Sequence, residues 1–334
     1  MTSTPREITF KEAVSEAMAQ EMERDERVFL MGEDLRVFYG GGPLGVTPAE
    51  KFFKKFGPER VRDTPISETA FIGAGVGAAM CGMKPIVELM FVDFFGVAMD
   101  QIYNQAGKLR YMFGGQGKVP MVLRTTIGAG FSFAAHHSQC LYSIFMHTPG
   151  LKLVIPSTPY DAKGLLISAI RDEDPVMFFE HKALYPTKGI VPEAEYTIPF
   201  AQADVKRKGK DVTIVATAMM VQKSLKAAKR LEEEGINVEI IDPRTLVPLD
   251  KTSILESVKK TSRLVIVDED YERCGFASEV AAIVADELFD SLEAPIKRVC
   301  TPNVPIPFAP VLEKTVIADE QKIIKTVKDV MEIQ

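Results

Sequence analysis

Short, nearly continuous apolar runs alternate along the first half of the chain with segments whose apolar residues recur every three or four positions. The runs predict strands and the periodic segments predict helices. The expected strands are Val28–Met31, Pro85–Phe91, Val119–Thr126, Leu151–Pro156 and Val176–Glu180; helices are expected from Thr9, over about 95–113 and over Pro159–Arg171, and a glycine-rich loop at Tyr39–Pro43. Because strands that alternate with helices favour a mostly parallel sheet, we expect an α/β domain with helices on both faces of the sheet.

The second half repeats the alternation on a smaller scale. Its expected strands are Asp211–Thr217, Asn237–Ile241, Leu264–Val267 and Ile296–Cys300, and its expected helices are Val221–Glu234, Ile254–Lys260, Ala277–Leu288 and one from about Asp319, after a proline-rich turn at Thr301–Pro310. Between the halves, Tyr185–Ala203 carries three prolines and no clear period. We therefore expect two three-layer domains with parallel sheets, residues 1–188 and 204–334, joined by a linker at 189–203.

One stretch of the first half, Arg62–Asp100, has the composition of a functional centre. An extended piece leads into a run rich in glycine and alanine, in which Gly73 and Gly77 leave a smooth face that another backbone can approach. Glu68 stands at the entrance to this run, and no cation follows it for fifteen residues. A carboxyl group in apolar surroundings is neutralised, paired or hydrogen-bonded, and can then share a proton near neutral pH. The alternative is an ordinary glutamate in a first helical turn, which the helix dipole favours.

Two of the four histidines, His136 and His137, follow a glycine-rich loop, Ile127–Phe131, that comes directly after an expected strand. Parallel sheets bind ligands at the carboxyl ends of their strands, so an acid/base role at a carbonyl substrate is one interpretation. A structural histidine with satisfied hydrogen bonds is the other. Because adjacent side chains are expected to point apart, and because His147 and His181 offer no ligand spacing, we do not expect these histidines to hold a metal.

Composition narrows the classes of partner and location. The chain has 334 residues, 46 % of them hydrophobic, and a net charge of −6 without a basic block. We therefore expect no nucleic acid and no membrane partner, and no apolar run approaches the roughly 18–20 residues that span a bilayer. The four cysteines are scattered without a C-x-x-C pair, and the first ten residues lack the layout of a secretory signal. These features favour reduced thiols in a cytoplasmic protein.

Several motifs of self-contained enzymes are absent from the sequence. There is no G-x-S-x-G, no P-loop and no H-E-x-x-H. There is also no G-D-G followed further on by a pair of asparagines, the pattern that would hold a magnesium diphosphate. If the chain binds a diphosphate cofactor, the sequence therefore predicts that another chain grips the diphosphate.

Segments spread over almost the whole chain carry a family resemblance. They are Arg62–Glu68 (RDTPISE), Glu88–Phe94 (ELMFVDF), Arg110–Gly115 (RYMFGG), His137–Gln139 (HSQ), Pro149–Lys152 (PGLK), Pro156–Gly164 (PSTPYDAKG) and Glu293–Arg298 (EAPIKR). Together they resemble the β subunit of the thiamine-diphosphate-dependent component of 2-oxo acid and acetoin dehydrogenase complexes, a transketolase-like family. The second and third segments look most like the acetoin branch, with the pyruvate branch as runner-up and the branched-chain branch as a further alternative.

The resemblance implies an oxidoreductase that is active only with an α subunit. It implies a pyrimidine-binding transketolase-like domain followed by a transketolase C-terminal-like domain, in an α2β2 heterotetramer with a second β subunit. The α subunit would hold Mg²⁺ and the diphosphate of thiamine diphosphate, in agreement with the missing G-D-G pattern. The assembly would cleave acetoin or decarboxylate a 2-oxo acid, and would pass the acyl unit to lipoamide on a dihydrolipoyl acyltransferase core.

The resemblance also implies roles for residues that match the family's motifs. Glu68 matches the glutamate that hydrogen-bonds the pyrimidine ring nitrogen. Phe94 matches the aromatic residue that packs on the pyrimidine, with Met90 and Ile66 lining the pocket. One position departs from the pattern, because Val97 stands where animal pyruvate enzymes have glutamine.

Further roles follow from the same resemblance. His137 matches the active-site histidine near the substrate and the incoming lipoyl group, and Glu33 matches an acidic residue of the tunnel between paired active sites. Some relatives also bind potassium through backbone carbonyl groups, here at Met121, Ala169, Asp172 and Asp174.

Two other classes of protein stay open beside this one. A self-sufficient transketolase-like enzyme would need the diphosphate motif that this chain lacks. A non-catalytic β-like assembly protein would not need Glu68 and His137, which are both present. Acetoin, pyruvate and branched-chain 2-oxo acids all stay open as substrates, because the α subunit builds much of the pocket.

Overall fold

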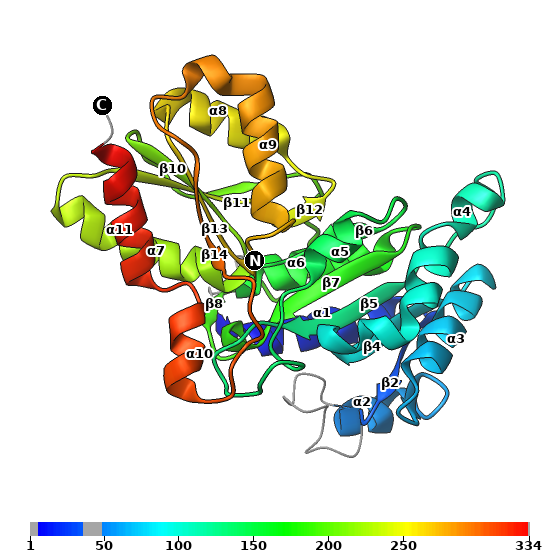
Figure 1. Cartoon of the computed structure of the whole chain (residues 1–334). Coiled ribbons are helices and arrows are strands. Elements are labelled where there is room, and N and C mark those ends of the chain that lie inside the picture. The colour runs from blue at the N-terminus through cyan, green and yellow to red at the C-terminus, as the bar shows by residue number, and fades with distance from the viewer. Residues whose placement is uncertain (1–5, 36–48, 333–334) are drawn as a thin grey trace. The chain divides into compact units, whose positions relative to one another are not determined.

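The structure is a computed structural model that describes residues 6–35 and 49–332 (Figure 1). It divides into two compact units, one made of Met1–Ile127 and Ile144–Phe200 and the other of Gly128–Ser143 and Ala201–Gln334. The glycine-rich loop expected at Tyr39–Pro43 lies outside the described residues. Within the described ranges, no helix is both long and apolar enough to cross a membrane.

The first unit is organised around a parallel sheet. Its strands follow the order β6-β7-β5-β4-β2-β3. Their bounds are β2 (Val28–Glu33), β3 (Val61–Thr64), β4 (Lys84–Phe91), β5 (Val122–Ile127), β6 (Lys152–Val154) and β7 (Val176–His181). A separate antiparallel pair joins β1 (Glu7–Thr9) to β8 (Lys188–Ile190), so a short strand lies where Tyr185–Ala203 showed no period.

The helices of this unit are α1 (Phe10–Arg24), α2 (Ala49–Phe56), α3 (Glu68–Met80), α4 (Leu109–Met112), α5 (Tyr142–Met146, which begins in the second unit) and α6 (Pro159–Arg171), with a 3-10 turn η3 (Lys182–Leu184). α1 packs against α6, and α3 packs against β4. The strand order reverses between α3 and α6, so right-handed crossovers put these two helices on opposite faces of the sheet. The helix expected from Thr9 is confirmed and begins with a capping box, in which the Glu12 N–H donates to the Thr9 hydroxyl at 3.2 Å and the Thr9 N–H donates to the Glu12 carboxylate at 2.8 Å.

The continuous helix expected over about 95–113 is wrong. The segment instead forms a 3-10 helix η1 (Val92–Ala98), a π-helix η2 (Gln101–Ala106) and α4. Gly107 follows η2, and its N–H bonds the Ile102 carbonyl in the wider π pattern. Glycine is a poor helix former, and packing against α3 decides the geometry here.

The second unit holds a smaller sheet with the order β14-β13-β10-β11-β9, parallel except for β9. The strands of this sheet are β9 (Asp204–Arg207), β10 (Val212–Ala216), β11 (Val238–Asp242), β13 (Leu264–Tyr271) and β14 (Lys297–Thr301), and the second unit also contains the short strand β12 (Thr245–Val247), which is not part of it. Its helices are α7 (Ala218–Glu233), α8 (Lys251–Thr261), α9 (Phe276–Leu288), α10 (Pro310–Val316) and α11 (Glu320–Met331), with a 3-10 turn η4 (Phe289–Ser291).

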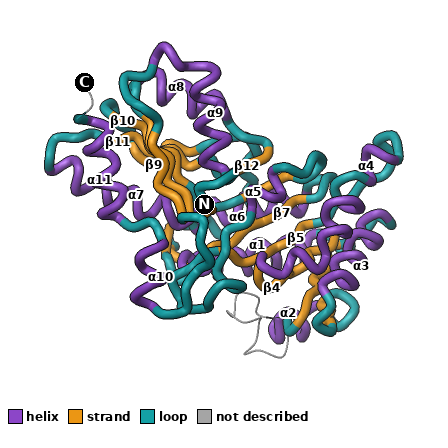
Figure 2. Tube along the Cα trace, in the orientation of Figure 1, coloured by secondary structure: helices purple, strands orange, loops and turns teal. Residues whose placement is uncertain are grey.

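Two pairs of helices cover the two faces of this sheet (Figures 1 and 2). α7 packs with α11, and α8 packs with α9. The core on the first face joins side chains such as Ile214 and Ile240 to Val327 of α11, all fully buried. The expected α/β architecture with largely parallel sheets is confirmed, whereas β9, β12 and α10 are elements that the apolar pattern did not predict.

Candidate functional site

Acidic side chains gather at the carboxyl-terminal part of the first unit's sheet. Glu33 ends β2, in register with Thr64 at the end of β3. Glu88 lies in the neighbouring strand β4, in register with Gly32. Because parallel sheets bind ligands at the carboxyl ends of their strands, this edge is the candidate site.

Glu68 is the first residue of α3 and is only 7 % exposed. The helix approaches the sheet closely because Gly75 has no side chain, since a Cβ there would lie 2.6 Å from Cγ2 of Val87 in β4. The Thr69 hydroxyl donates to the Val97 carbonyl at 2.5 Å and joins the first turn of α3 to η1. Glu68 is therefore buried at a helix N-terminus, where backbone N–H groups favour a carboxylate.

Gly73 and Gly77 do not together form the smooth face that the sequence predicted for them. A Cβ on Gly73 would lie 2.9 Å from the side-chain oxygen of Gln101, so this glycine faces its own chain. Gly77 is exposed and has open space beside it. Only the second of the two therefore offers a surface that another chain can approach.

The pKa of Glu33 is shifted well away from the ordinary value of a glutamate. It is 4 % exposed, and its Oε2 has no hydrogen-bond partner among the described residues. Burial raises the pKa of Glu33 to about 7, and the negative charges of Glu68, Asp34 and Glu88 add to the effect. Glu33 therefore exchanges a proton near neutral pH, and its Oε2 is left for a partner that these residues do not supply.

The apolar residues that the family resemblance places at the pyrimidine pocket differ in their exposure. Phe94 is half-buried in η1, with its ring perpendicular to that of Phe91 and the centroids 5.9 Å apart. Met90, near the end of β4, is also half-buried. Ile66 and Val97 are 71 % and 62 % exposed. Contact of Phe94, Met90 and Ile66 with a cofactor stays a prediction, and Val97 is the position that departs from the family's pattern.

A buried ion network lies beneath the acidic edge. Arg124 of β5 contacts Glu180 through two nitrogens, at 2.7 and 3.0 Å, and contacts Glu88 at 2.9 Å. Tyr185 donates its hydroxyl to Glu180 at 3.0 Å. Burial would lower the pKa of Arg124, but the charges of Glu180 and Glu88 raise it above its usual range. We did not expect this network, although an arginine inside the apolar run of β5 is a signal for it.

Residues 128–143, here called the histidine loop, leave β5 and belong to the second unit. The far end of the loop is tied to the end of β13. The Tyr142 hydroxyl donates to Asp268, and the Ser143 hydroxyl donates to Asp270 at 2.5 Å. Burial raises the pKa of both aspartates. The pKa of Asp270 rises to about 7, because the negative charge of Asp268 adds to the effect of burial.

Backbone N–H groups at the start of the histidine loop converge on two buried carboxylates. Ala129 donates to Glu269 at 2.7 Å. Gly130 and Ser132 donate to Glu313 of α10, at 2.8 and 3.1 Å. Gly130 and Ser132 have φ values of 106° and 57°, a left-handed pattern that turns nearby N–H groups toward one anion. These anchors were missed, because Glu313 follows a stretch that reads as a proline-rich turn.

His136 and His137 lie together in this loop. Their ring centroids are 4.6 Å apart and their Nδ1 atoms 2.7 Å apart. The expectation that the two side chains point apart is wrong, because it assumes an extended backbone, whereas Ala134, two residues before His136, has a φ of 66°. His136 is exposed and His137 is half-buried.

The residues expected to offer carbonyl groups to potassium lie near the end of α6 and the start of β5. The Met121 carbonyl accepts the N–H of Val176 at 2.9 Å, and the Ala169 carbonyl accepts that of Asp172 at 3.3 Å. A carbonyl oxygen has two lone pairs, so a second partner can still bind each one. These atoms are therefore compatible with a potassium ion without requiring it.

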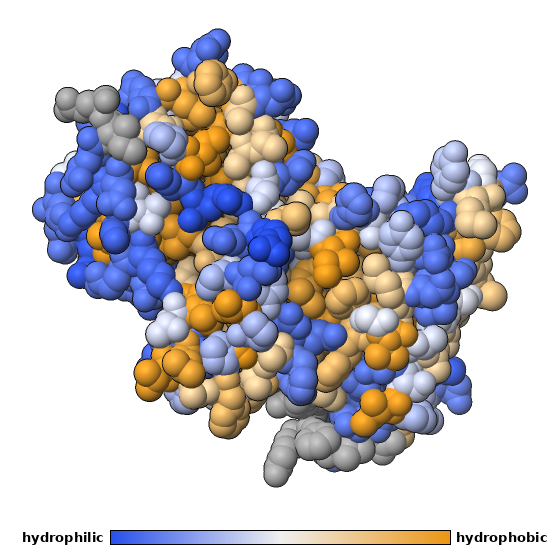
Figure 3. Space-filling model, viewed as in Figure 1, coloured by the Kyte–Doolittle hydropathy of each residue, from blue (hydrophilic) through white to orange (hydrophobic). Residues whose placement is uncertain are grey.

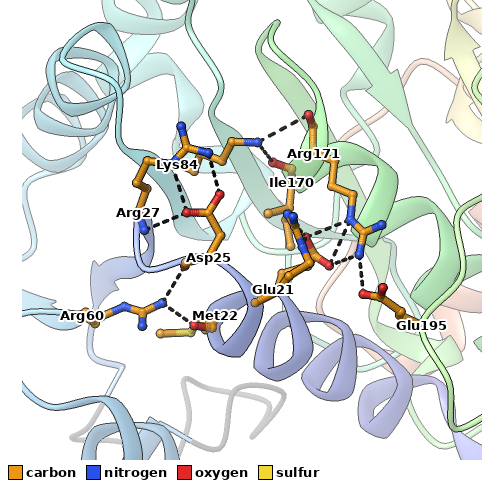
Figure 4. A network of polar contacts seen from close by, with 10 residues as sticks. Glu21, Met22, Asp25, Arg27, Arg60, Lys84, Ile170, Arg171 and Glu195 are labelled. Atoms are coloured by element: carbon orange, nitrogen blue, oxygen red, sulfur yellow. Dashed lines mark hydrogen bonds and ion pairs between the residues drawn. The ribbon is translucent and has the colours of Figure 1, made fainter.

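Two lysine ammonium groups of the chain lie near these carbonyl groups. Lys84 donates to the Ile170 carbonyl at 3.2 Å and to the next carbonyl along α6 (Figure 4). Lys152 lies 2.8 Å from the Asp172 carboxylate and 3.1 Å from that of Asp174. Two lysines therefore supply positive charge where a bound cation was expected.

Comparison with known proteins gives one consistent family. Residues 6–188 match the model of the transketolase pyrimidine-binding domain, and residues 201–323 match that of the transketolase C-terminal domain. The β subunit of acetoin:2,6-dichlorophenolindophenol oxidoreductase is 52 % identical in Cupriavidus necator and 50 % identical in Bacillus subtilis, each over 98 % of both chains. The β subunit of 2-oxoisovalerate dehydrogenase from Bacillus subtilis is 45 % identical over 97 % of this chain and 99 % of its own.

A solved structure described as "Split gene transketolase, inactive beta4 tetramer" has the same fold. It aligns with a TM-score of 0.78 and 23 % identity, over 98 % of this chain and 99 % of that one. The two-unit architecture is therefore that of the transketolase fold.

Proposed function

This chain belongs to the β subunits of the thiamine-diphosphate-dependent acetoin and 2-oxo acid dehydrogenases, and from that premise we propose that it acts with an α subunit to cleave acetoin oxidatively and to pass the acyl unit to lipoamide. Acetoin is the first choice of substrate because the relatives named for it share more of the sequence than the 2-oxoisovalerate relative does. Pyruvate is the second choice. A non-catalytic role is disfavoured because Glu33, at the carboxyl end of β2, is a buried acid, and burying an ionisable group costs folding free energy that a purely structural protein would not need to spend.

The pair formed by Glu68 and Glu33 is the observation that supports this proposal most. When bound, thiamine diphosphate supplies a thiazolium ring that adds to a carbonyl and accepts the electron pair of the bond that breaks. Glu68, buried at the start of α3, would hold the proton at the pyrimidine ring nitrogen. Glu33 feels the charge of Glu68 and binds a proton near pH 7, so it would exchange that proton with its neighbour.

The other proposed roles follow the same assignment. Phe94 would pack against the pyrimidine, and Met90 and Ile66 would complete an apolar wall once the α subunit covers them. His137 would hold or give a proton at the substrate and the incoming lipoyl group. Because the chain lacks the diphosphate motif, the α subunit would hold Mg²⁺ and the diphosphate.

Exposed apolar side chains support association with other chains. Figure 3 shows apolar surface over the regions of α4 and α10. The residues concerned are Tyr111 (88 % exposed), Met112 (71 %), Phe113 (54 %), Phe308 (68 %), Val311 (76 %) and Leu312 (55 %). Such groups are costly in water, and an α2β2 assembly docked on an acyltransferase core would cover them. The four cysteines are free thiols, which supports a reducing compartment such as the cytoplasm.

Potassium binding by the carbonyl groups of Met121, Ala169, Asp172 and Asp174 is a separate proposal. The two accepting carbonyls described above keep a second lone pair, and the C-terminal end of α6 favours a cation. A bound potassium ion would have a structural role, near the amino end of β5 and the carboxyl end of α6.

The test is Glu68→Gln in the co-expressed α–β complex, with Glu59→Gln, an exposed glutamate of the same unit, as control. C2-proton exchange of bound thiamine diphosphate is followed by NMR. An amide cannot exchange a proton as a carboxyl does, so the rate should fall by roughly 10²–10⁴ while assembly survives. If Glu68 is only a first-turn residue, the variant loses at most about 1 kcal/mol of stability and exchanges at the wild-type rate, which would overturn the proposal.

A further inference from the structure

We propose that His136 is a positioning residue for His137, and that the two imidazoles share one proton and relay it between solvent and the group that His137 addresses. This inference rests on the proposed role of His137. It starts from the 2.7 Å between the two Nδ1 atoms and the 4.6 Å between the ring centroids.

The distance fixes how the proton is shared. Two nitrogen lone pairs repel at 2.7 Å, so one Nδ1 must carry a hydrogen and donate it to the other. When His136 donates, His137 carries its own hydrogen on Nε2 and can act as an acid there. When His137 donates, its Nε2 has a lone pair and can act as a base. His136 therefore selects the tautomer of His137.

The proton balance requires a pair with one positive charge. In that state His136 has hydrogens on both nitrogens, and His137 has one on Nε2. His137 gives the Nε2 proton outward while the shared proton moves from His136 to Nδ1 of His137. Both rings end neutral, and the charge of the pair falls from +1 to 0 by the one proton delivered. The cationic pair forms from the neutral pair in which His136 donates its Nδ1 hydrogen, because His136 is exposed and water can then protonate its unoccupied Nε2. When Nε2 of His137 later takes up a proton as a base, the shared proton moves back to His136, which releases its Nε2 proton to water, and the pair returns to its first neutral state.

The surroundings hold this geometry in place. Glu269 and Glu313 bind the backbone at the start of the histidine loop, and the Tyr271 hydroxyl donates to the Gln139 side chain at 3.1 Å just after the pair. Asp268 and Asp270 hold the far end through hydroxyl groups. Both ends of the histidine loop are thus fixed by hydrogen bonds to side chains of the second unit.

The experiment compares three variants of the assembled α–β enzyme. His136→Gln can still donate a hydrogen bond but cannot relay a proton, and His136→Ala can do neither. His147→Gln changes an exposed histidine outside the loop and is the matched control. Each enzyme is assayed for acetoin-dependent reduction of dichlorophenolindophenol and for single-turnover acyl transfer to a lipoyl domain.

We expect both His136 variants to lose roughly 10-fold or more in acyl transfer, because general acid catalysis is worth roughly 10²–10⁴, and to lose less in the dye-coupled rate, which needs no proton transfer to the lipoyl group. Added imidazole should restore acyl transfer in His136→Ala, an effect that a purely structural role would not produce. Wild-type acyl transfer in His136→Gln, or no rescue by imidazole, would overturn the relay.

A second measurement needs no turnover. With only four histidines in the chain, ¹⁵N NMR can assign which ring nitrogen carries hydrogen in each. We expect a hydrogen-bonded Nδ1–H in the wild-type pair and a changed tautomer of His137 in His136→Ala. Identical His137 spectra would refute the shared proton even if the proposed function holds, whereas absence of acetoin turnover in the wild-type complex would refute the function alone.

Discussion

Replacing Glu33 by glutamine should stabilise the folded chain at alkaline pH and impair its activity. The change keeps the size of the side chain but removes a carboxyl group that is buried beside Glu68 and Glu88. A glutamine is neutral at every pH, so it does not carry the cost of a buried negative charge. The activity should fall because the proposed proton exchange with Glu68 is lost.

The magnitude follows from the pKa. In the unfolded chain a glutamate ionises near its ordinary value of 4.5, whereas Glu33 in the folded chain has a pKa of about 7. Between these values the folded state binds more protons, so the free energy of unfolding falls as the pH rises from about 4.5 to about 7 and stays lower above. At about 1.4 kcal/mol for each pKa unit, the full loss is about 3 kcal/mol, and we expect about 1–3 kcal/mol after local relaxation.

The assay is urea unfolding of wild-type chain, Glu33→Gln and the exposed control Glu59→Gln at pH 5 and pH 8. The stability advantage of Glu33→Gln should be small at pH 5 and should grow by about 1–3 kcal/mol at pH 8. The control should show no such growth. An advantage of Glu33→Gln that is the same at both pH values would refute the argument that Glu33 is held protonated by burial.

Three other perturbations have expected outcomes. Arg124→Met leaves Glu180 buried without its cation and should cost about 3–5 kcal/mol in urea unfolding, with a smaller cost for Arg124→Lys; a cost below about 1 kcal/mol would contradict the buried network. Glu313→Ala removes the acceptor of two N–H groups, so limited proteolysis should cut the histidine loop several-fold faster, whereas the exposed Lys314→Ala on the same helix should leave cleavage unchanged. Replacing NaCl by KCl at constant ionic strength should raise the melting temperature if the carbonyl set binds potassium, and equal melting temperatures would remove that proposal.

The elements that the sequence pattern predicted well are those with strong local signals. The bounds of α6 match because Thr158 caps the helix and Pro159 starts it, both next to a clear apolar period. The start of α1 matches because its capping box involves residues only three apart. The segment after β4 does not match, because η1 and η2 are shaped by packing against α3 and not by their own periodicity.

Some features of the candidate site could likewise be predicted from the sequence, and others could not. The burial of Glu68 could be predicted, because the apolar and glycine-rich run that follows it is visible in the sequence. The pKa of Glu33 could not, because it arises from charges on β2, α3 and β4 that only the fold brings together. The contact between His136 and His137 depends on a left-handed residue in the loop before them, which no apolar period reveals.

The histidine loop has a consequence for exchanging parts between members of this family. The chain runs from the first unit into the second at Gly128, returns at Ile144, and crosses again at Ala201. A chimera joined only in the 189–203 region would take the loop from one parent and Glu269 and Glu313, the carboxylates that bind its backbone, from the other. Residues 128–143 are therefore part of the C-terminal module in recombination, and substrate or acceptor preferences that depend on His137 should be inherited with them.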